Sequence, residues 1–310
     1  MEQMITDHSI ATIIVNWNGC ATTVACVQAL LDAGEPQTAI FVVDNGSTDD
    51  SVTTLRPRFP QITVLEAGEN LGFARGSNLA ARHVLLKFPA GGAHAAYSYL
   101  FLLNNDAFVN ADTLPGLVAA LEQTPRAAAA VPKILYGDGR RLWYGGGHVD
   151  WKTGTGVHRA KGELDRGQAD RPGFVTFAPG CALLLRRDIV APEGPFDPRY
   201  FFMGEDVDLS LRLTRAGRPI LYVPSATVRH QVAASSGRQG LPFIWYHMTR
   251  NRLLTVSKHA TAGQKALFFV CWPPRWLFKA LIFMARGEGA VARAMWRAVQ
   301  DFRGGRFGPS

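Results

Sequence analysis

Four apolar runs in the first third of the chain each end in a cluster of polar side chains. The runs are rich in β-branched and aromatic residues, as buried strands are, and helical spacing of apolar residues separates them. Strands and helices that alternate with short connections predict an α/β fold with a mostly parallel sheet flanked by helices. The polar clusters lie at residues 16–18, 44–47, 70–75 and 104–106. Because ligands bind at the carboxyl ends of parallel strands, these clusters predict a binding site.

The net charge of +8 is concentrated near the end of the chain. Up to Thr249 there are 22 Lys and Arg residues against 23 Asp and Glu, whereas from Arg250 onward there are 11 against 2. A basic tail on a neutral body suggests a polyanionic partner, either a membrane or nucleic acid. Leu and aromatic residues dominate the tail, and the chain has no helix-turn-helix or RNA-binding signature. We therefore expect a membrane surface and no nucleic acid.

Residues 261–310 are predicted to form this tail, a basic amphipathic segment separate from a body of residues 1–260. The tail has no uncharged stretch of 18 residues, so a membrane-spanning helix is not expected. After Pro273 and Pro274, a helical wheel places five basic side chains on one edge, with Gly287 and Gly289 as candidate breaks. These five are Arg275, Lys279, Arg286, Arg293 and Arg297. The pattern is typical of a helix in the lipid interface; the alternative is a helix packed on the body.

The cysteine content and the N-terminus bear on the compartment. Four cysteines in 310 residues, without metal-type spacing, fit a reducing environment. The first ten residues carry acidic side chains and no apolar segment of a signal peptide. We therefore expect a cytoplasmic protein associated with the inner face of the plasma membrane.

Acidic and imidazole side chains supply the candidate chemistry. Asp106 ends the fourth strand and could hold a divalent cation that in turn holds a diphosphate, although a loop cap is the alternative. Glu205, Asp206 and Asp208 open a predicted helix, and N-capping explains only one of the three. His230 closes the last strand, where it suits a metal position or a satisfied core histidine.

Eight segments, in this order, resemble family 2 glycosyltransferases of the GT-A fold, and most closely the bacterial rhamnosyltransferase-like branch. They are IIVNWNG, VVDNGSTDDS, NLGFARGSN, LLNNDAFV, APGCALLLRRD, FFMGEDVDLSLRL, VRH and YHMTRNRLL, within residues 8–260. The resemblance implies transfer of a sugar, with inversion, from a nucleotide diphosphate to a hydroxyl of a glycan or polyprenyl-diphosphate-linked acceptor. It points to dTDP-L-rhamnose as donor, to Mg²⁺ or Mn²⁺ as cofactor, and to cell-surface polysaccharide synthesis.

The resemblance also implies roles for residues that bind the donor. Asp44 would bind the base of the nucleotide sugar, with Asn16 and Trp17 walling the base. Arg75 would lie near the base and the diphosphate.

A second group would act on the diphosphate and the acceptor hydroxyl. Asn104, Asn105 and Asp106 stand where the family has its DXD motif, with Asp106 as the metal-binding aspartate and His230 as an additional ligand. Because the first position is Asn104, one charge is missing and strict metal dependence is in doubt. Glu205 and Asp206 resemble the family's ED motif, with Asp206 as the general base.

Four more residues are candidates for contact with the donor sugar or the acceptor. Gly180 and Cys181 would lie near the donor sugar, and a core strand with a turn explains them as well. Arg250 and Asn251 are candidates for an acceptor or diphosphate role, and a plain amphipathic helix is the alternative.

Two other functional classes remain open from the sequence. A nucleotidyltransferase would also use a parallel sheet and a metal, but VNWNGC is not its glycine-rich phosphate loop. A non-catalytic, membrane-bound sugar-nucleotide sensor would keep the binding site without the chemistry. A dehydrogenase is disfavoured because no G-x-G-x-x-G follows the first strand.

Overall fold

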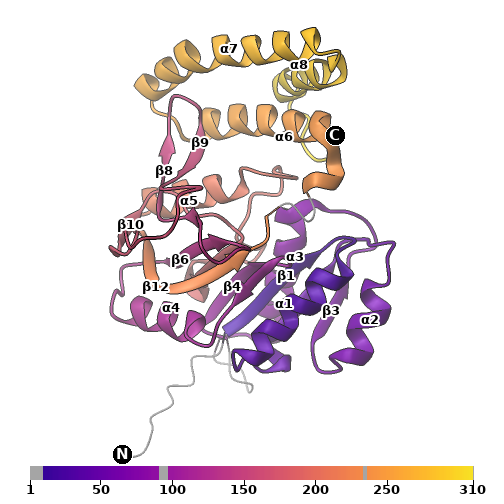
Figure 1. Ribbon diagram of the computed structural model, residues 1–310, viewed down its shortest axis with the longest axis vertical. Coiled ribbons are helices and arrows are strands. Elements are labelled where there is room, and N and C mark those ends of the chain that lie inside the picture. The colour runs from indigo at the N-terminus through magenta and orange to yellow at the C-terminus, as the bar shows by residue number, and fades with distance from the viewer. Residues whose placement is uncertain (1–9, 91–96, 233–235, 310) are drawn as a thin grey trace, which may run out of the picture.

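The computed structural model describes residues 10–90, 97–232 and 236–309, which form a large sheet with helices around it and a helical layer at one end (Figure 1). Ten strands make the sheet, in the order β10-β12-β6-β11-β4-β1-β2-β3, with β5 paired to β12 and β7 to β6. The strands are β1 (Ile10–Asn16), β2 (Ile40–Asp44), β3 (Thr63–Glu66), β4 (Tyr99–Asn104), β5 (Ala107–Val109), β6 (Ala129–Tyr136), β7 (Leu142–Tyr144), β10 (Gly173–Val175), β11 (Ala182–Arg186) and β12 (Ile220–His230).

The first half of the sheet is parallel, as the sequence predicts. β1 pairs with both β2 and β4, in a register that sets Asn16 beside Asp44 and Val15 beside Asn104. The polar ends of three strands therefore meet at one edge. The connecting helices are α1 (Cys20–Asp32), α2 (Ser51–Arg58) and α3 (Gly72–Lys87).

The second half makes the sheet mixed rather than mostly parallel. β11 runs antiparallel between β4 and β6, whereas β6 and β12 are parallel to each other. α4 (Thr113–Glu122) follows β5, and α5 (Glu205–Arg215) precedes β12. β12 ends at His230, where it pairs with Ala107 of β5. This pairing brings the end of the last strand back to residues that follow β4.

Residues 137–173, between β6 and β10, contain hairpin strands. β7 extends the main sheet, while β8 (Gly147–Asp150) and β9 (Thr155–His158) form a separate two-stranded hairpin. Figure 1 shows the β8–β9 hairpin reaching from the sheet toward the helical layer.

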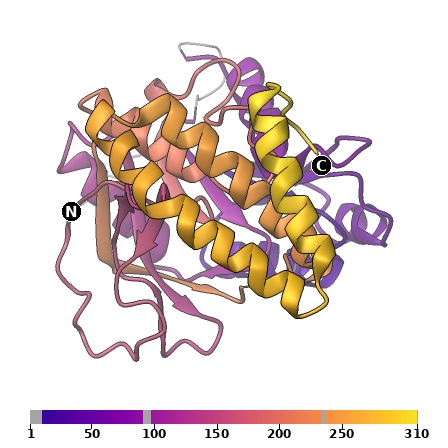
Figure 2. The same ribbon diagram turned by 90° about the horizontal axis from the view of Figure 1, so that it is seen from above.

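The helical layer consists of α6 (Ser236–His259), α7 (Ala262–Ala285) and α8 (Gly289–Arg303), seen from above in Figure 2. α7 begins with a capping box in which Thr261 and Gln264 each bond the other's backbone N–H. Its buried side chains recur every three or four residues, as one helical face requires, and pack on α6 and α8. They are Phe268, Trp272, Trp276, Ala280 and Phe283.

One expectation about the tail needs correction, that its five basic side chains share one helix edge. α7 continues through Pro273 and Pro274 and is, among the described residues, the one helix long and apolar enough by length and composition to cross a membrane. The chain turns at Gly287 (φ +75°), one of the two candidate breaks, and begins α8 two residues later. Arg275 and Lys279 therefore do not share a helix with Arg293 and Arg297. The domain boundary at residue 260 stays a prediction.

Candidate active site

A cavity of about 290 Å³ lies at the polar edge of the sheet and contains most of the predicted site. Its walls come from the ends of β1, β4 and β12, the start of α3, and the turn that leads into α5. The predicted residues that line it are Trp17, Asn104, Asn105, Asp106, Gly180, Cys181, Glu205, Asp206 and His230. Residues separated by as many as 213 positions in the chain thus share one pocket.

Asn16 and Asp44 lie behind this wall, where they are almost fully buried. The side-chain amide of Asn16 donates to Asp44 Oδ1 at 3.1 Å. Asn16 Oδ1 accepts from the Thr23 hydroxyl at 2.7 Å and from the Asn105 amide at 3.3 Å. Asp44 Oδ2 also accepts from the Ser47 amide at 3.0 Å. These bonds hold the carboxyl ends of β2, β1 and β4 in register. Asp44 and Asn16 are not among the residues that line the cavity, so their contact with a base stays a prediction.

Asp106 and His230 form a buried pair on the cavity wall. His230 Nε2 lies 3.0 Å from Asp106 Oδ1 and 3.5 Å from the amide of Asn104. His230 Nδ1 is buried and has no hydrogen-bond partner in the described part of the chain. The ring also meets Trp143 edge-on, with centroids 4.8 Å apart.

The pair offers two metal ligands, a carboxylate oxygen and an imidazole nitrogen. Within residues 10–90, 97–232 and 236–309, no group of three or more His, Cys, Asp or Glu residues gathers to hold a metal. Asp106 and His230 therefore do not form an all-protein metal site. They do fit a cation whose remaining ligands come from substrate phosphates and water, as is usual for Mg²⁺.

Glu205 and Asp206 open α5 with different environments. Glu205 is buried, and Glu205 Oε2 has no hydrogen-bond partner among the described residues. Burial, and then the charge of Asp206, raise the pKa of Glu205 well above its usual range, which favours its neutral form. Burial also raises the pKa of Asp206, but the backbone amides of Val207 (2.8 Å) and Gly180 (3.4 Å) stabilise its ionised form. Asp206 is therefore the carboxylate of the two that is able to accept a proton.

The turn before α5 is strained and tied to α6. Met203 and Gly204 both have positive φ values, 65° and 95°. At Gly204 an added Cβ would lie 3.2 Å from Tyr200 and 3.4 Å from Asn251. The Asn251 amide donates to the carbonyls of Phe202 at 2.9 Å and Met203 at 2.6 Å. Asn251 thus positions the chain entering Glu205 and Asp206, although it does not line the cavity itself.

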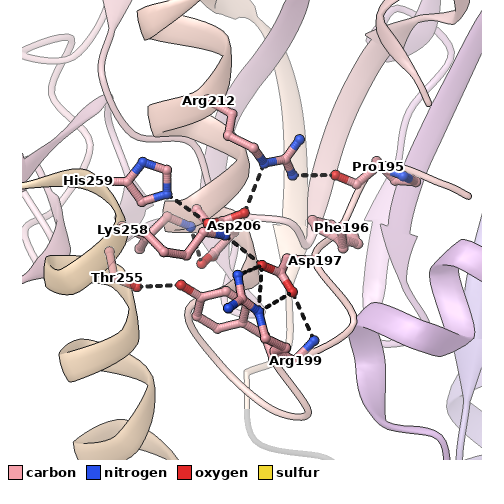
Figure 3. Close-up of polar contacts among 12 residues, drawn as sticks. Pro195, Phe196, Asp197, Arg199, Asp206, Arg212, Thr255, Lys258 and His259 are labelled. Carbon is pink, nitrogen blue, oxygen red and sulfur yellow. Dashed lines mark hydrogen bonds and ion pairs between the residues drawn. The ribbon is translucent and has the colours of Figure 1, made fainter. Parts of the chain in front are cut away.

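A network of ion pairs holds the first turns of α5 in place (Figure 3). Asp208 is fully buried and accepts from Arg212 at 2.9 Å, from His259 at 2.7 Å and from Lys258. Figure 3 shows Lys258 beside Asp197, to which it donates at 2.6 Å. These bonds lower the pKa of Asp208 despite its burial, so it remains ionised. Asp208 therefore has a structural role, which explains why a third acidic residue stands at the start of this helix.

Gly180 and Cys181 lie between the two acidic sides of the cavity. Burial, and then the charges of Asp106 and Asp206, raise the pKa of the Cys181 thiol far above its usual range. The thiol is therefore neutral and is not a nucleophile. An added Cβ at Gly180 would lie 3.3 Å from Phe73 and 3.7 Å from Asp206, so the glycine keeps this wall thin.

Two predicted arginines do not line the cavity. Arg75 is exposed on α3, and its Nε donates to the Pro198 carbonyl at 3.1 Å. Arg250 is fully buried and donates to the carbonyl of Gly308 at 2.8 Å and to Asn251 Oδ1 at 3.2 Å. Arg250 therefore binds the C-terminal segment, and a substrate contact for either arginine stays a prediction.

The sequence analysis did not predict the aromatic residues that line the cavity. They are Phe73, Trp143, Phe201, Phe202 and Phe243. Trp143 belongs to the short strand β7, where a single tryptophan gives no periodic signal. The pair Phe201 and Phe202 stands four residues before the acidic pair and could have been noticed for that proximity.

The chain is similar to a curated relative and to two solved structures. The N-acetylglucosaminyl-diphospho-decaprenol L-rhamnosyltransferase of Mycobacterium tuberculosis is 29% identical over 246 residues, which cover 74% of this chain and 78% of the relative. A Pyrobaculum calidifontis mannosyltransferase, solved with GDP-Man and Mn²⁺, matches 95% of this chain and 87% of its own with a TM-score of 0.57 at 13% identity. GalNAc-T7, solved with UDP, GalNAc and Mn²⁺, matches 80% of this chain and 47% of its own with a TM-score of 0.58 at 17% identity.

These two solved structures share the fold, and a separate match identifies the family. Residues 11–191, more than half of the chain, match the family described as "Glycosyl transferase family 2". The region includes the strand ends that carry Asp44 and Asp106 and the wall formed by Gly180 and Cys181. The chain belongs to glycosyltransferase family 2 and has its GT-A fold.

Proposed function

We propose that the protein is an inverting rhamnosyltransferase that moves L-rhamnose from dTDP-L-rhamnose to a hydroxyl of a polyprenyl-diphosphate-linked sugar. The observation that carries this proposal is that Asp106, His230 and Asp206 line one cavity. The M. tuberculosis relative, a rhamnosyltransferase by name with an N-acetylglucosaminyl-diphospho-decaprenol acceptor, supports the choice of donor sugar and acceptor.

Asp206 is the proposed base. Inversion at the sugar carbon requires the acceptor hydroxyl to attack from the face opposite the leaving diphosphate, and a carboxylate at hydrogen-bond distance can take its proton. Asp206 has one cavity-facing carboxylate held by two backbone amides, so its orientation is set before substrate binds. Glu205 is neutral, so it adds no negative charge that would further disfavour the ionised form of Asp206.

Asp106 and His230 are the proposed ligands of a divalent cation, Mg²⁺ or Mn²⁺. When bound there with the donor diphosphate, the cation would neutralise charge on the leaving group. The neighbouring Asn104 contributes an amide in place of a carboxylate, so among the described residues beside His230 Asp106 supplies the one negative charge. That single charge favours a cation shared with phosphate oxygens over one held by protein alone.

α7 is the proposed membrane contact. One face packs on α6 and α8, and the opposite face exposes Leu267, Phe269, Val270, Leu277, Phe278, Leu281 and Met284. Arg275 and Lys279 are exposed on the same helix, where they could meet anionic headgroups. Figure 1 places α7 at the end of the molecule, beyond α6. A helix with one face buried in protein suits a position in the interface on the cytoplasmic side of the membrane.

The test is a product analysis with the full chain, dTDP-L-rhamnose, Mn²⁺ and a short-chain prenyl-diphosphate-linked N-acetylglucosamine. The proposal predicts free dTDP and a rhamnosylated acceptor whose anomeric configuration is opposite to that of the donor. Release of inorganic diphosphate would instead indicate a nucleotidyltransferase. Tight donor binding without any transfer to this acceptor would count for a sensor.

A further inference from the structure

A second cavity, of about 150 Å³, shares two wall residues with the first. Asp206 and Met203 line both cavities. The remaining walls come from the β8–β9 hairpin, the first turn of α5 and the middle of α6. This volume is about half that of the first cavity, so the second cavity suits one group of a larger substrate. The proposed base thus stands on the boundary between two compartments.

Arg252 of α6 lies on the wall of this second cavity and has no anionic partner among the described residues. The side chain is half-buried, and burial lowers its pKa to about 10. In the described part of the chain it makes no ion pair or hydrogen bond, and its Nε is buried without an acceptor. Arg250, two residues earlier, is by contrast bonded to Tyr246, Asn251 and Gly308. Burying the Nε donor without an acceptor is costly, which favours a ligand that supplies an acceptor to this guanidinium.

The hairpin wall connects the second cavity to the helical layer. At Gly154 (φ +67°) an added Cβ would lie 2.8 Å from Val256 of α6 and 3.2 Å from Phe268 of α7. At Gly156 it would lie 2.5 Å from the ring of Phe177. Both glycines therefore let the hairpin close against neighbouring side chains. Phe268 lies on the buried face of α7, so the wall of the cavity abuts the helix whose other face is exposed and apolar.

We propose that the second cavity is an acceptor subsite in which Arg252 binds the phosphate of a lipid-diphosphate-linked sugar while the sugar hydroxyl meets Asp206. The inference rests on the proposed function for the identity of the acceptor. It assigns an order from the membrane inward: lipid beside α7, phosphate at Arg252, acceptor hydroxyl at Asp206 and donor in the first cavity. It also places the acceptor contact at Arg252 in place of Arg250, whose guanidinium is already occupied.

The test compares Arg252→Gln with Arg252→Lys and with a matched control, Arg82→Gln, which alters an exposed arginine of α3 that lines neither cavity. Initial rates are measured with farnesyl-diphospho-N-acetylglucosamine and with an uncharged octyl glycoside of N-acetylglucosamine. Arg252→Gln should raise KM for the diphosphate acceptor tenfold or more and leave KM for the glycoside and for dTDP-L-rhamnose within twofold. Arg252→Lys should recover part of the loss, and Arg82→Gln should match the wild type.

Two kinetic outcomes would overturn the inference. An equal rise in KM for both acceptors would mean that Arg252 has only a structural place, and a rise in KM for the donor would move it to the donor diphosphate. If the wild type transfers no rhamnose, the proposed function fails, and titration of farnesyl diphosphate into dTDP-saturated protein decides the inference separately. Binding weakened tenfold by Arg252→Gln would support the phosphate subsite, and binding unchanged by it would overturn the subsite.

Discussion

His230 Nε2 lies 3.0 Å from Asp106 Oδ1, although the two residues are 124 positions apart in the chain. β12 pairs with β5 through His230 and Ala107, and this pairing brings the imidazole to the carboxylate that follows β4. The contact joins the parallel half of the sheet to its mixed half. It places both side chains on the wall of the first cavity.

Substituting Asp106 should remove the metal dependence of nucleotide binding. Wild-type protein is expected to bind dTDP about tenfold more tightly with Mn²⁺ than with EDTA, a difference of ~1.4 kcal/mol. Asp106→Asn should bind equally in both conditions because the carboxylate that holds the cation is gone. Calorimetric titration measures this, with Asp112→Asn, an exposed carboxylate before α4, as control. A metal effect that survives in Asp106→Asn would exclude Asp106 as a ligand.

Glu205 should make the protein less stable as the pH rises. Its pKa is raised in the folded state, so above the usual Glu range the folded state keeps a proton that the unfolded chain has lost. The free energy of unfolding therefore falls as the pH rises from the ordinary pKa of Glu to the raised one. Glu205→Gln should flatten this fall in stability, as measured by thermal unfolding from pH 5 to 8. The control is Glu163→Gln, at an exposed residue distant in sequence, which should keep the pH dependence of the wild type. An identical slope in Glu205→Gln would contradict the assignment.

Asn251 should act on turnover and not on donor affinity. Asn251→Ala removes both donors to the turn at Phe202 and Met203, so Asp206 loses its fixed position. Because small misplacements are costly in catalysis, kcat should fall about tenfold to a hundredfold, with KM for the donor nearly unchanged. Ser257→Ala, which removes one hydrogen bond within α6, is the control. A parallel rise in donor KM would place Asn251 at the donor.

Replacing exposed apolar residues of α7 should weaken membrane binding. Phe278 and Leu281 are 64% and 51% exposed, so Phe278→Ser with Leu281→Ser should leave the fold intact. Burying each such side chain in lipid is worth ~1.5–3 kcal/mol, which predicts about a hundredfold weaker binding. Flotation with vesicles that contain anionic lipid measures this. Leu86→Ser, equally apolar and 70% exposed on α3, should float like the wild type, and unchanged flotation of the double variant would refute α7 as the contact.

The parallel half of the fold could be predicted because each strand and helix there carries its own local pattern. Asn104, Asn105 and Asp106 could be assigned to a strand end for that reason, and the register of β1 with β4 confirms their position. The mixed half could not, since the placement of β11 between β4 and β6 depends on contacts distant in sequence.

Parts of the site could not be predicted from the sequence either. Arg250 and Arg252 are two residues apart on one helix, and no sequence pattern indicates that the first is bonded internally while the second faces a cavity. Trp143 reaches the cavity from a short strand without periodicity. In both cases tertiary packing, and not local propensity, decides which side chain is available to a ligand.

The measurement that tests the account most directly is transfer and donor binding by Asp206→Asn in the same preparation. The substitution keeps the size of the side chain and removes its ability to accept a proton. We predict that rhamnosyl transfer falls at least a thousandfold, within reach of the 10²–10⁴-fold contribution typical of a general base, while dTDP-L-rhamnose binds within about twofold of the wild type. Transfer that persists, or donor affinity that collapses together with turnover, would contradict the role of Asp206 as the base.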